Sequence, residues 1–214
     1  MHILLLGATG ATGRHLLPLA LDRGLRVTAL VRDASKLSDV AHEQLTVVEG
    51  DAADEAAVAA AMGGVDAVVS VLGAPASSRS GIRGRATEVQ LRAMARTGVD
   101  RLISLSSLGV GDSAERMPWY LTWLVVPFWL KHAFADHEVQ ERLIRESDVR
   151  WTLVRPTFMN DKPATGAIQP LQEVSPKQVG LGVTREDVAR FMVDEVAEPR
   201  WVHRAAELVG RRAA

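Results

Sequence analysis

The chain lacks cysteine, and only one of its 214 residues is a tyrosine. Without cysteine there is no disulfide bond, no thiolate nucleophile and no cysteine-ligated zinc site. This composition is compatible with a cytoplasmic protein, and we expect that location. The formal net charge is only −1, so the sequence predicts no attraction to nucleic acid and none to an anionic membrane surface.

Segments that would target the chain to a membrane are also lacking. The N-terminus does not show the basic segment and cleavable apolar stretch of a signal peptide. The longest aromatic and apolar run, residues 119–130, is too short to cross a bilayer and contains Pro127. We therefore expect no membrane partner.

The sequence does contain a regular alternation of apolar and helical segments. Hydrophobic residues make up 47% of the chain, which is enough for one core, and we expect a single domain over residues 1–214. Apolar segments of strand length occur at 3–6, 27–31, 45–48, 67–71, 102–105 and 152–154, and segments of helix length at 13–23, 54–61, 84–97 and 133–146. This alternation predicts an α/β fold with a doubly wound parallel sheet of Rossmann type.

The alternation stops after residue 155. Residues 156–182 contain several prolines and glycines and show no clear period, so we expect them to form a loop region on the substrate side, over the carboxyl edge of the sheet. Thr184 and the acidic residues after it then predict the start of an amphipathic helix. Residues 207–209 predict a last short strand.

A glycine-rich turn follows the first predicted strand. Its spacing is GxxGxxG, and it consists of Gly7, Ala8, Thr9, Gly10, Ala11, Thr12 and Gly13. In a dinucleotide-binding turn the first glycine lets the chain reverse, the second lets backbone N–H groups approach phosphate, and the third lets helix and strand pack closely. The helix N-terminus adds partial positive charge. We therefore expect Gly7, Thr9, Gly10, Ala11, Thr12 and Gly13 to bind a dinucleotide, against the alternative of a turn with no ligand.

The end of the second predicted strand indicates which dinucleotide binds. NAD-specific proteins place an acidic residue there for the ribose hydroxyls, whereas this strand ends in Arg32, with Asp33 after it. A guanidinium pairs well with a 2′-phosphate, and Arg14 is within reach of the same region. The sequence favours NADPH (NADP+) as the cofactor. Asp33 leaves NADH as the alternative, and a solvated strand-end charge is the alternative role for Arg32.

Four motifs together resemble a known family. They are the glycine turn at 7–13, Val-Arg-Asp at 31–33, Gly50-Asp51, and Trp-Thr-Leu-Val-Arg-Pro at 151–156. The chain resembles the atypical short-chain dehydrogenases/reductases. Within them it is similar to the NAD(P)H-binding group that contains NmrA-like proteins and the flavin reductase also called biliverdin IXβ reductase.

The resemblance implies further cofactor contacts. Asp51 is expected near the adenine, and Leu72 and Gly73 are expected to line the nucleotide. Pro156 and Thr157 are expected to flank the nicotinamide.

The usual proton donor of short-chain dehydrogenases is absent from the sequence. They carry Tyr-x-x-x-Lys, but the single tyrosine, Tyr120, is followed four residues later by Leu124. Reduction of a ketone needs a matched proton donor, whereas flavins, quinones and linear tetrapyrroles spread the arriving charge by conjugation. The loss of the pair therefore favours a conjugated acceptor, or no catalysis.

Two residues match the tyrosine-free reductases in this group. Ser107 corresponds to their serine after the fifth strand, with Ser106 beside it as a cofactor contact, and His137 lies in the same part of the helix as their histidine. We expect Ser107 and His137 to be the catalytic residues, His137 as a donor with an ordinary pKa of about 6.5. The alternatives are a half-exposed helical histidine and a serine bonded only to local backbone. No metal site is predicted, since His132 and His137 are five residues apart.

Three functions fit these residues. The first is an NADPH-dependent oxidoreductase that passes hydride to a small-molecule acceptor, namely a flavin, quinone or tetrapyrrole. The second is a non-catalytic NmrA-like regulator that senses NAD(P), and the third, least favoured, is a sugar-nucleotide epimerase or dehydratase. The aromatic segment 119–130 is interpreted as an acceptor lid, as core, or as a dimer surface. We expect a monomer or a homodimer.

Overall fold

A central sheet organises the computed structural model, which describes residues 1–75, 78–116, 130–173, 179–180 and 182–211. Within these residues the strands are ordered β3-β2-β1-β4-β5-β6-β11-β8, and β9 also pairs with β11. The bounds are β1 His2–Leu6, β2 Arg26–Val31, β3 Leu45–Glu49, β4 Ala67–Ser70, β5 Arg101–Leu105, β6 Arg150–Pro156, β8 Ile168–Pro170, β9 Val179–Gly180 and β11 Arg204–Arg211. All pairings from β3 to β11 are parallel, whereas β8 and β9 run antiparallel to β11.

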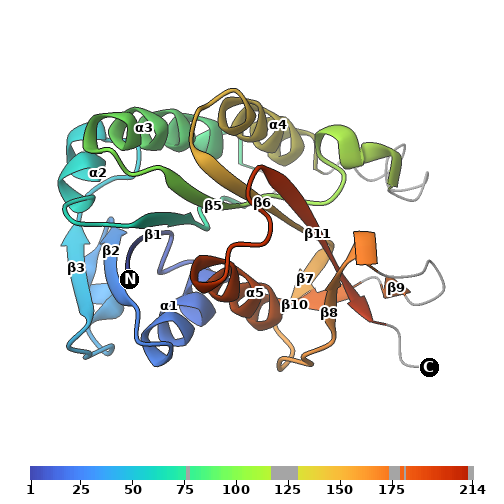
Figure 1. Ribbon diagram of the computed structural model, residues 1–214, viewed down its shortest axis with the longest axis horizontal. Coiled ribbons are helices and arrows are strands. Elements are labelled where there is room, and N and C mark those ends of the chain that lie inside the picture. The colour runs from blue at the N-terminus through green and yellow to red at the C-terminus, as the bar shows by residue number, and fades with distance from the viewer. Residues whose placement is uncertain (76–77, 117–129, 174–178, 181, 212–214) are drawn as a thin grey trace.

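Helices cover both faces of this sheet. In Figure 1 α2, α3 and α4 lie over one face, and α1 and α5 lie over the other. Their bounds are α1 Gly13–Asp22, α2 Glu55–Ala61, α3 Ile82–Thr97, α4 Lys131–Arg145 and α5 Arg185–Ala197. The predicted α/β fold with a doubly wound, Rossmann-type parallel sheet is therefore confirmed.

The central strands contribute side chains to two separate hydrophobic cores, because successive side chains point to opposite faces of the sheet. Ile3 and Leu5 of β1 pack in the core under α1 and α5, whereas Leu4 and Leu6 pack in the core under α2, α3 and α4. A strand buried on both faces reads as a continuous apolar run. This is why the sequence revealed the strands so clearly.

Two helices begin at residues whose side chains cap them, and one of these, Thr184, is the predicted start. The Asp54 carboxylate accepts hydrogen bonds from the N–H groups of Ala56 and Ala57 at the start of α2. Thr184 Oγ1 accepts from Asp187 N at the start of α5 (3.0 Å). Each side chain satisfies backbone donors that lack a partner in the first turn of a helix.

The segment 156–182 differs from the expected irregular loop. It contains β8 and β9, which extend the main sheet, and β7 Phe158–Asn160, which pairs in parallel with β10 Gly182–Thr184. The last strand, β11, is longer than the predicted 207–209. Of the aromatic segment 119–130, all but Leu130 lies outside the described residues. Among the residues with described positions, no helix is long and apolar enough to cross a bilayer.

Candidate functional site

The glycine turn lies at the point where the strand order reverses. β1 is between β2 and β4, so the loops that follow β1 and β4 leave the sheet side by side. Gly7 has φ +91°, and a Cβ there would lie 2.8 Å from the carbonyl oxygen of Val71. A Cβ on Gly13 would collide with the carbonyl oxygen of Gly7. Both glycines are therefore required by the close approach of backbone segments.

The start of α1 has the properties of a phosphate site. Thr12 is the N-cap but its side chain makes no capping bond, and the first turn contains no acidic residue. Gly10 N donates to Gly7 O (2.9 Å), and Arg14 N donates to Gly10 O (3.0 Å). Among the described residues, no acceptor is found for the N–H groups of Ala11 and Thr12. These free donors at a helix N-terminus fit the pyrophosphate of a dinucleotide.

The carboxylate beside Arg32 is held by its own turn. Asp33 accepts hydrogen bonds from Ser35 N (3.1 Å) and Ser35 Oγ (2.6 Å), and it lies 3.7 Å from the Lys36 ammonium. The bonds from Ser35, together with Lys36, lower the pKa of Asp33. Arg32 itself is exposed. The Asp33 carboxylate thus already has partners in Ser35 and Lys36, and the Arg32 guanidinium is accessible at the carboxyl end of β2.

Arg14 holds the glycine turn from the exposed side. Its Nε donates to the carbonyl oxygen of Thr9 (3.2 Å), which ties α1 to the turn before it. Asp51, at the end of β3, accepts a hydrogen bond from Ala53 N (2.9 Å), and its side chain is exposed. The expected contact of Asp51 with the adenine stays a prediction.

The loop after β4 is pinned by an arginine that sequence reasoning missed. Leu72 packs on the core beneath α3, and exposed Gly73 lies next to Arg83. Arg83 donates to the carbonyl oxygen of Ala74 (3.4 Å) and pairs with Asp136 of α4 (3.3 Å). Leu72 and Gly73 are therefore at the expected edge of the sheet, and their contact with the nucleotide stays a prediction.

Ser106 and Ser107 follow β5 but lie in different environments. Ser106 is buried, and its hydroxyl donates to Glu141 Oε1 of α4 (2.6 Å). Ser107 is half-buried, and among the described residues its hydroxyl donates only to the carbonyl oxygen of Leu108 (3.2 Å). The Ser107 hydroxyl can turn toward a ligand, whereas that of Ser106 is engaged. The cofactor contact of Ser106 stays a prediction.

Pro156 and Thr157 lie next to residues 106–108, which follow β5 and which we call the serine loop. Leu108 N donates to the carbonyl oxygen of Pro156 (3.0 Å), and Thr157 N donates to that of Leu208 (3.0 Å). Thr157 Oγ1 is buried, and no described residue provides it with a hydrogen-bond partner. An unpaired buried hydroxyl is costly, so this atom fits a site that a polar ligand completes.

The next residues join this edge to the glycine turn. Met159 Sδ lies 4.0 Å from Thr12 Oγ1. Side chains alternate along β7, so Phe158 points the other way, and the residue is 53% exposed. The carboxyl ends of β1, β4, β5 and β6 thus meet around one site.

His137 is a neutral, buried ring in this structure. It is only 8% exposed, and burial, reinforced by the Arg83 charge, lowers its pKa to about 4. Gln140 Nε2 donates to Ser104 Oγ (3.0 Å), so Gln140 Oε1 accepts the Nδ1–H of His137 (2.9 Å). A neutral imidazole has one N–H, and this one is already used. The alternative of a half-exposed helical histidine is thus wrong, and the pKa of the ring is not the ordinary 6.5. A cationic His137 donor is not available near pH 7, and the catalytic role of His137 stays a prediction.

The buried His137 should make the protein sensitive to acid. Its pKa is about 4 in the folded state and about 6.5 when unfolded, so the unfolded state takes up the proton first as the pH falls from 6.5 to 4. Over this window the free energy of unfolding is expected to fall by about 3 kcal/mol from this group. Urea unfolding at pH 7.5, 6 and 5 should show a shallower loss in His137→Asn.

A matched control lies on the same helix. His132 is exposed on α4, and His132→Asn should keep the wild-type dependence of stability on pH. An equal loss of stability in wild type and His137→Asn between pH 6.5 and 4 would contradict this account of the ring.

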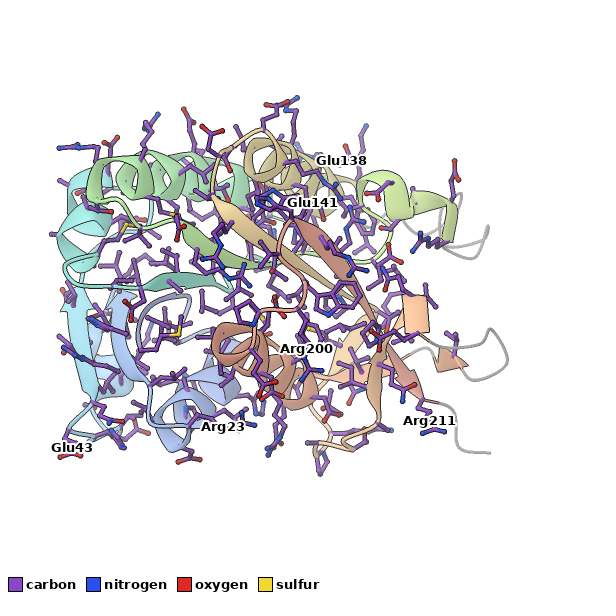
Figure 2. All side chains as sticks on the ribbon, viewed as in Figure 1. Arg23, Glu43, Glu138, Glu141, Arg200 and Arg211 are labelled. Carbon is purple, nitrogen blue, oxygen red and sulfur yellow. The ribbon has the colours of Figure 1, made fainter. Side chains whose placement is uncertain are left out.

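The face of α4 toward the sheet is polar, which the hydrophobic pattern did not indicate. His137, Gln140 and Glu141 are buried there, and Glu141, labelled in Figure 2, bonds to Arg155 of β6. Their spacing is that of one helix face. It could have been read from the sequence as a set of polar partners for the strand ends.

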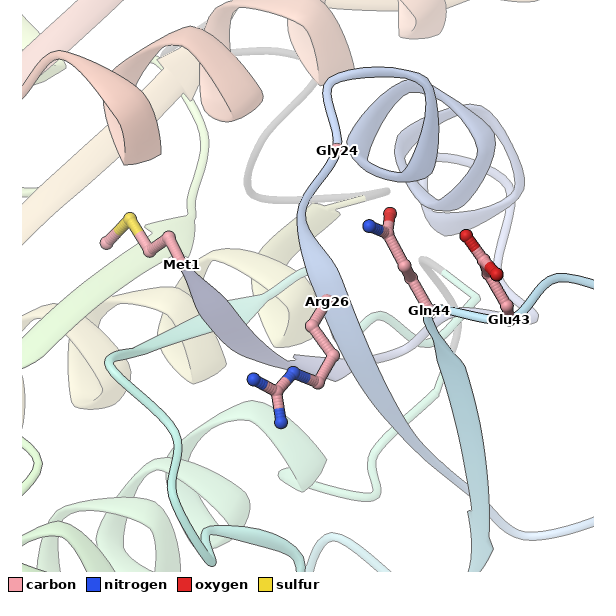
Figure 3. Close-up of a pocket in the computed structure, with 5 residues that line it drawn as sticks. All are labelled: Met1, Gly24, Arg26, Glu43 and Gln44. Carbon is pink, nitrogen blue, oxygen red and sulfur yellow. The ribbon is translucent and has the colours of Figure 1, made fainter.

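A pocket found elsewhere is remote from this edge. This hollow has a volume of about 380 Å³. The residues that line it, shown in Figure 3, are Met1, Gly24, Arg26, Glu43 and Gln44. These residues lie at the amino ends of β1, β2 and β3, opposite to the glycine turn. No group of three or more metal-ligating side chains is found in the part of the chain that the structure describes.

The sequence of this chain matches a family of known proteins. The sequence model of a family described as NAD(P)H-binding matches residues 7–199. The chain belongs to this NAD(P)H-binding family. This agrees with the resemblance to atypical short-chain dehydrogenases/reductases and shows a nicotinamide dinucleotide cofactor.

Three proteins that are similar to this chain in sequence carry names of different kinds. UPF0659 protein YMR090W of Saccharomyces cerevisiae is 28% identical over 93% of this chain and 88% of its own. The uncharacterized sugar epimerase YhfK of Bacillus subtilis is 25% identical over 97% and 94%. The NAD(P)H azoreductase of Xenophilus azovorans is 26% identical over 99% and 68%.

Solved structures confirm the fold of this family member. The oxidoreductase ylbE from Lactococcus lactis has a TM-score of 0.84 at 19% identity, over 100% of this chain and 93% of its own. ChuY, an anaerobilin reductase from Escherichia coli O157:H7, has a TM-score of 0.80 at 24% identity, over 100% and 99%. A short-chain dehydrogenase/reductase of Veillonella parvula in complex with NADP has a TM-score of 0.78 at 19% identity, over 97% and 93%.

Proposed function

We propose that this protein is an NADPH-dependent reductase that transfers hydride to a conjugated acceptor such as a flavin, a quinone or a linear tetrapyrrole. The observation that carries the proposal is the proton-donor chemistry of the site. The Tyr-x-x-x-Lys pair is absent from the sequence, and the His137 ring is neutral with its N–H already donated. An acceptor that delocalises the arriving charge needs no strong acid beside it.

The chain's own residues would bind and orient the two reactants. The N–H groups at the start of α1 would hold the pyrophosphate, and Arg32 would pair with the 2′-phosphate of NADPH. Thr157 Oγ1 would bond to the nicotinamide carboxamide, and Ser107 Oγ would donate to the acceptor.

The overall reaction balances with one solvent proton. The bound cofactor supplies a hydride, which carries two electrons from C4 of the dihydronicotinamide to the acceptor. With a quinone, NADPH, a proton and the quinone give NADP+ and the hydroquinone. The site's main contribution would be to hold the donor and acceptor carbons at reacting distance.

Two similar proteins support a reductase. One is the NAD(P)H azoreductase, since an azo bond is itself a conjugated acceptor, and the other is the anaerobilin reductase ChuY. Both hydrophobic cores pack on one sheet, which supports the proposal that the whole chain works as one domain.

Steady-state oxidation of NADPH tests this function. We expect the absorbance at 340 nm to fall when FMN, dichlorophenolindophenol or menadione is offered under anaerobic conditions, and to fall more slowly with NADH at the same concentration. The control is the protein with acceptor but no dinucleotide. NADPH binding without turnover of any acceptor would instead favour a regulator that senses NAD(P).

A further inference from the structure

Arg155 is the largest side chain fully buried in the described residues, with an exposed fraction of 0%. It is the last residue but one of β6 and contacts three carboxylates. Its Nε and Nη2 donate to Glu141 Oε1 (2.9 Å) and Oε2 (2.5 Å), and Nη2 also reaches Asp112 Oδ1 (2.7 Å). Nη1 lies 3.5 Å from Glu207 Oε1. Burial would lower the pKa of Arg155, but the bonds to Glu141 and Asp112 raise it instead.

Two more arginines balance these acids. Arg116 pairs with Glu207, and Arg145 lies 3.0 Å from Asp112 and 3.8 Å from Glu141. We call Asp112, Arg116, Glu141, Arg145, Arg155 and Glu207 the Arg155 cluster. It joins α4, β6 and β11 to the short helix η2 Gly111–Arg116, and its six formal charges sum to zero.

Stability alone does not explain such a cluster. Burying charged groups costs several kcal/mol per ion after relaxation, and well-packed apolar side chains of the same volume are often as stable. A buried ion pair does, however, fix the relative positions of the elements that carry it. The question is which atoms this cluster positions.

The Arg155 cluster is hydrogen-bonded to the serine loop after β5. Glu141 Oε1, held by Arg155, accepts the Ser106 hydroxyl (2.6 Å). The loop backbone is tied to β6 on both sides of Ser107, through Ser106 N to Val154 O (2.7 Å) and Leu108 N to Pro156 O (3.0 Å). Ser107, whose hydroxyl donates to the adjacent carbonyl oxygen of Leu108 (3.2 Å), therefore lies between two neighbours that are tied to β6.

We propose that Glu141 and Arg155 are positioning residues, which act through Ser106 to fix where the Ser107 hydroxyl meets the acceptor. This inference rests on the proposed reductase function. A misplacement of a reacting group by about 1 Å can cost up to about a hundredfold in rate. Weakening the contacts from Arg155 through Glu141 to Ser106 should therefore lower kcat without weakening cofactor binding at the glycine turn.

Double-mutant cycles that pair Glu141 or Ser106 with Ser107 test the inference. Glu141→Gln keeps the shape of the side chain but removes its charge, and Ser106→Ala removes only the hydroxyl link. Each is expected to lower kcat with menadione about tenfold, and Glu141→Gln is expected to change the NADPH Kd less than about twofold. Ser107→Ala should show a similar loss, and Ser107→Ala combined with either change should be no slower than Ser107→Ala alone.

The chain offers a matched control for loss of a buried ion pair. Arg101 and Glu195 are 2.8 Å apart with side chains only 3% and 2% exposed, and Arg101 begins β5 at the opposite edge of the sheet. Glu195→Gln should destabilise the fold as Glu141→Gln does, but leave kcat unchanged when each variant is assayed well below its own Tm.

Several outcomes would overturn the inference. These are an additive loss in the double variants, an equal loss of kcat in Glu195→Gln, or full activity in Ser107→Ala. Because wild-type turnover is measured first, its absence would count against the proposed function, whereas turnover without coupling would count against the positioning role alone. If Glu141→Gln does not fold, the Ser106→Ala cycle decides the matter.

Discussion

Replacement of Gly13 by alanine is expected to abolish NADPH binding. A Cβ at this position would collide with the carbonyl oxygen of Gly7 and lie 2.8 Å from Cα of Ala8. These are backbone atoms of the same turn, so they move only if the turn opens. Opening it would displace the free N–H groups of Ala11 and Thr12. We expect the NADPH Kd to rise at least about a hundredfold, a loss of about 3 kcal/mol, measured by fluorescence titration.

Gly63 provides the control for this substitution. A Cβ on Gly63 would meet only the carbonyl oxygen of Ala60, at 3.8 Å, and the residue lies after α2, away from the glycine turn. Gly63→Ala should bind NADPH like wild type. Circular dichroism should show that Gly13→Ala keeps its helices, so that lost binding is separated from lost folding. Tight binding by a folded Gly13→Ala would show that the turn does not hold the dinucleotide.

Replacement of Arg32 by alanine is expected to change the choice between the two dinucleotides. Arg32 is exposed at the carboxyl end of β2, and Asp33 beside it is held by Ser35. A guanidinium forms two parallel hydrogen bonds with a phosphate. We expect Arg32→Ala to raise the Kd of NADPH about thirtyfold, or about 2 kcal/mol, and that of NADH less than about threefold. Calorimetric titration with each dinucleotide would measure both values.

The same strand supplies a control arginine. Arg26 begins β2 at the amino edge of the sheet, where it lines the hollow in Figure 3. Arg26→Ala removes the same charge and should leave both affinities unchanged. The NADPH preference should also weaken as salt is raised, because an exposed phosphate contact is screened. Equal losses for NADPH and NADH in Arg32→Ala would refute the assignment of the 2′-phosphate to this residue.

Most of the fold could be predicted from the sequence because its strands are apolar on both faces. The run before Gly7 is continuous since Ile3 and Leu4 pack in two different cores. The caps Asp54 and Thr184 were also readable, as each bonds to backbone only two or three residues away. Local chemistry of this kind is visible in a sequence.

Elements that depend on distant partners were not predicted. β8 and β9 are two or three residues long, and they exist because they pair with β11, which lies far along the chain. The length of β11 follows from the same pairings. No local pattern encodes such strands.

The candidate site divides in the same way. The glycine turn is a local motif, and the φ of Gly7 (+91°) agrees with the chain reversal expected there. The state of His137 is not local, since its low pKa arises from burial on the inner face of α4 and from the charge of Arg83 on α3. Arg155 was visible in the motif at 151–156, but its three carboxylates come from distant segments.

Single-turnover oxidation of bound NADPH tests the central claim most directly. The protein is loaded with a stoichiometric amount of NADPH and mixed in a stopped-flow instrument with menadione or FMN, and the 340 nm absorbance is followed. Hydride transfer to a conjugated acceptor predicts a single decay that depends on the protein and is slower when C4 of the dihydronicotinamide carries deuterium. Bound NADPH that stays reduced, or decays no faster than free NADPH with the same acceptor, would contradict it.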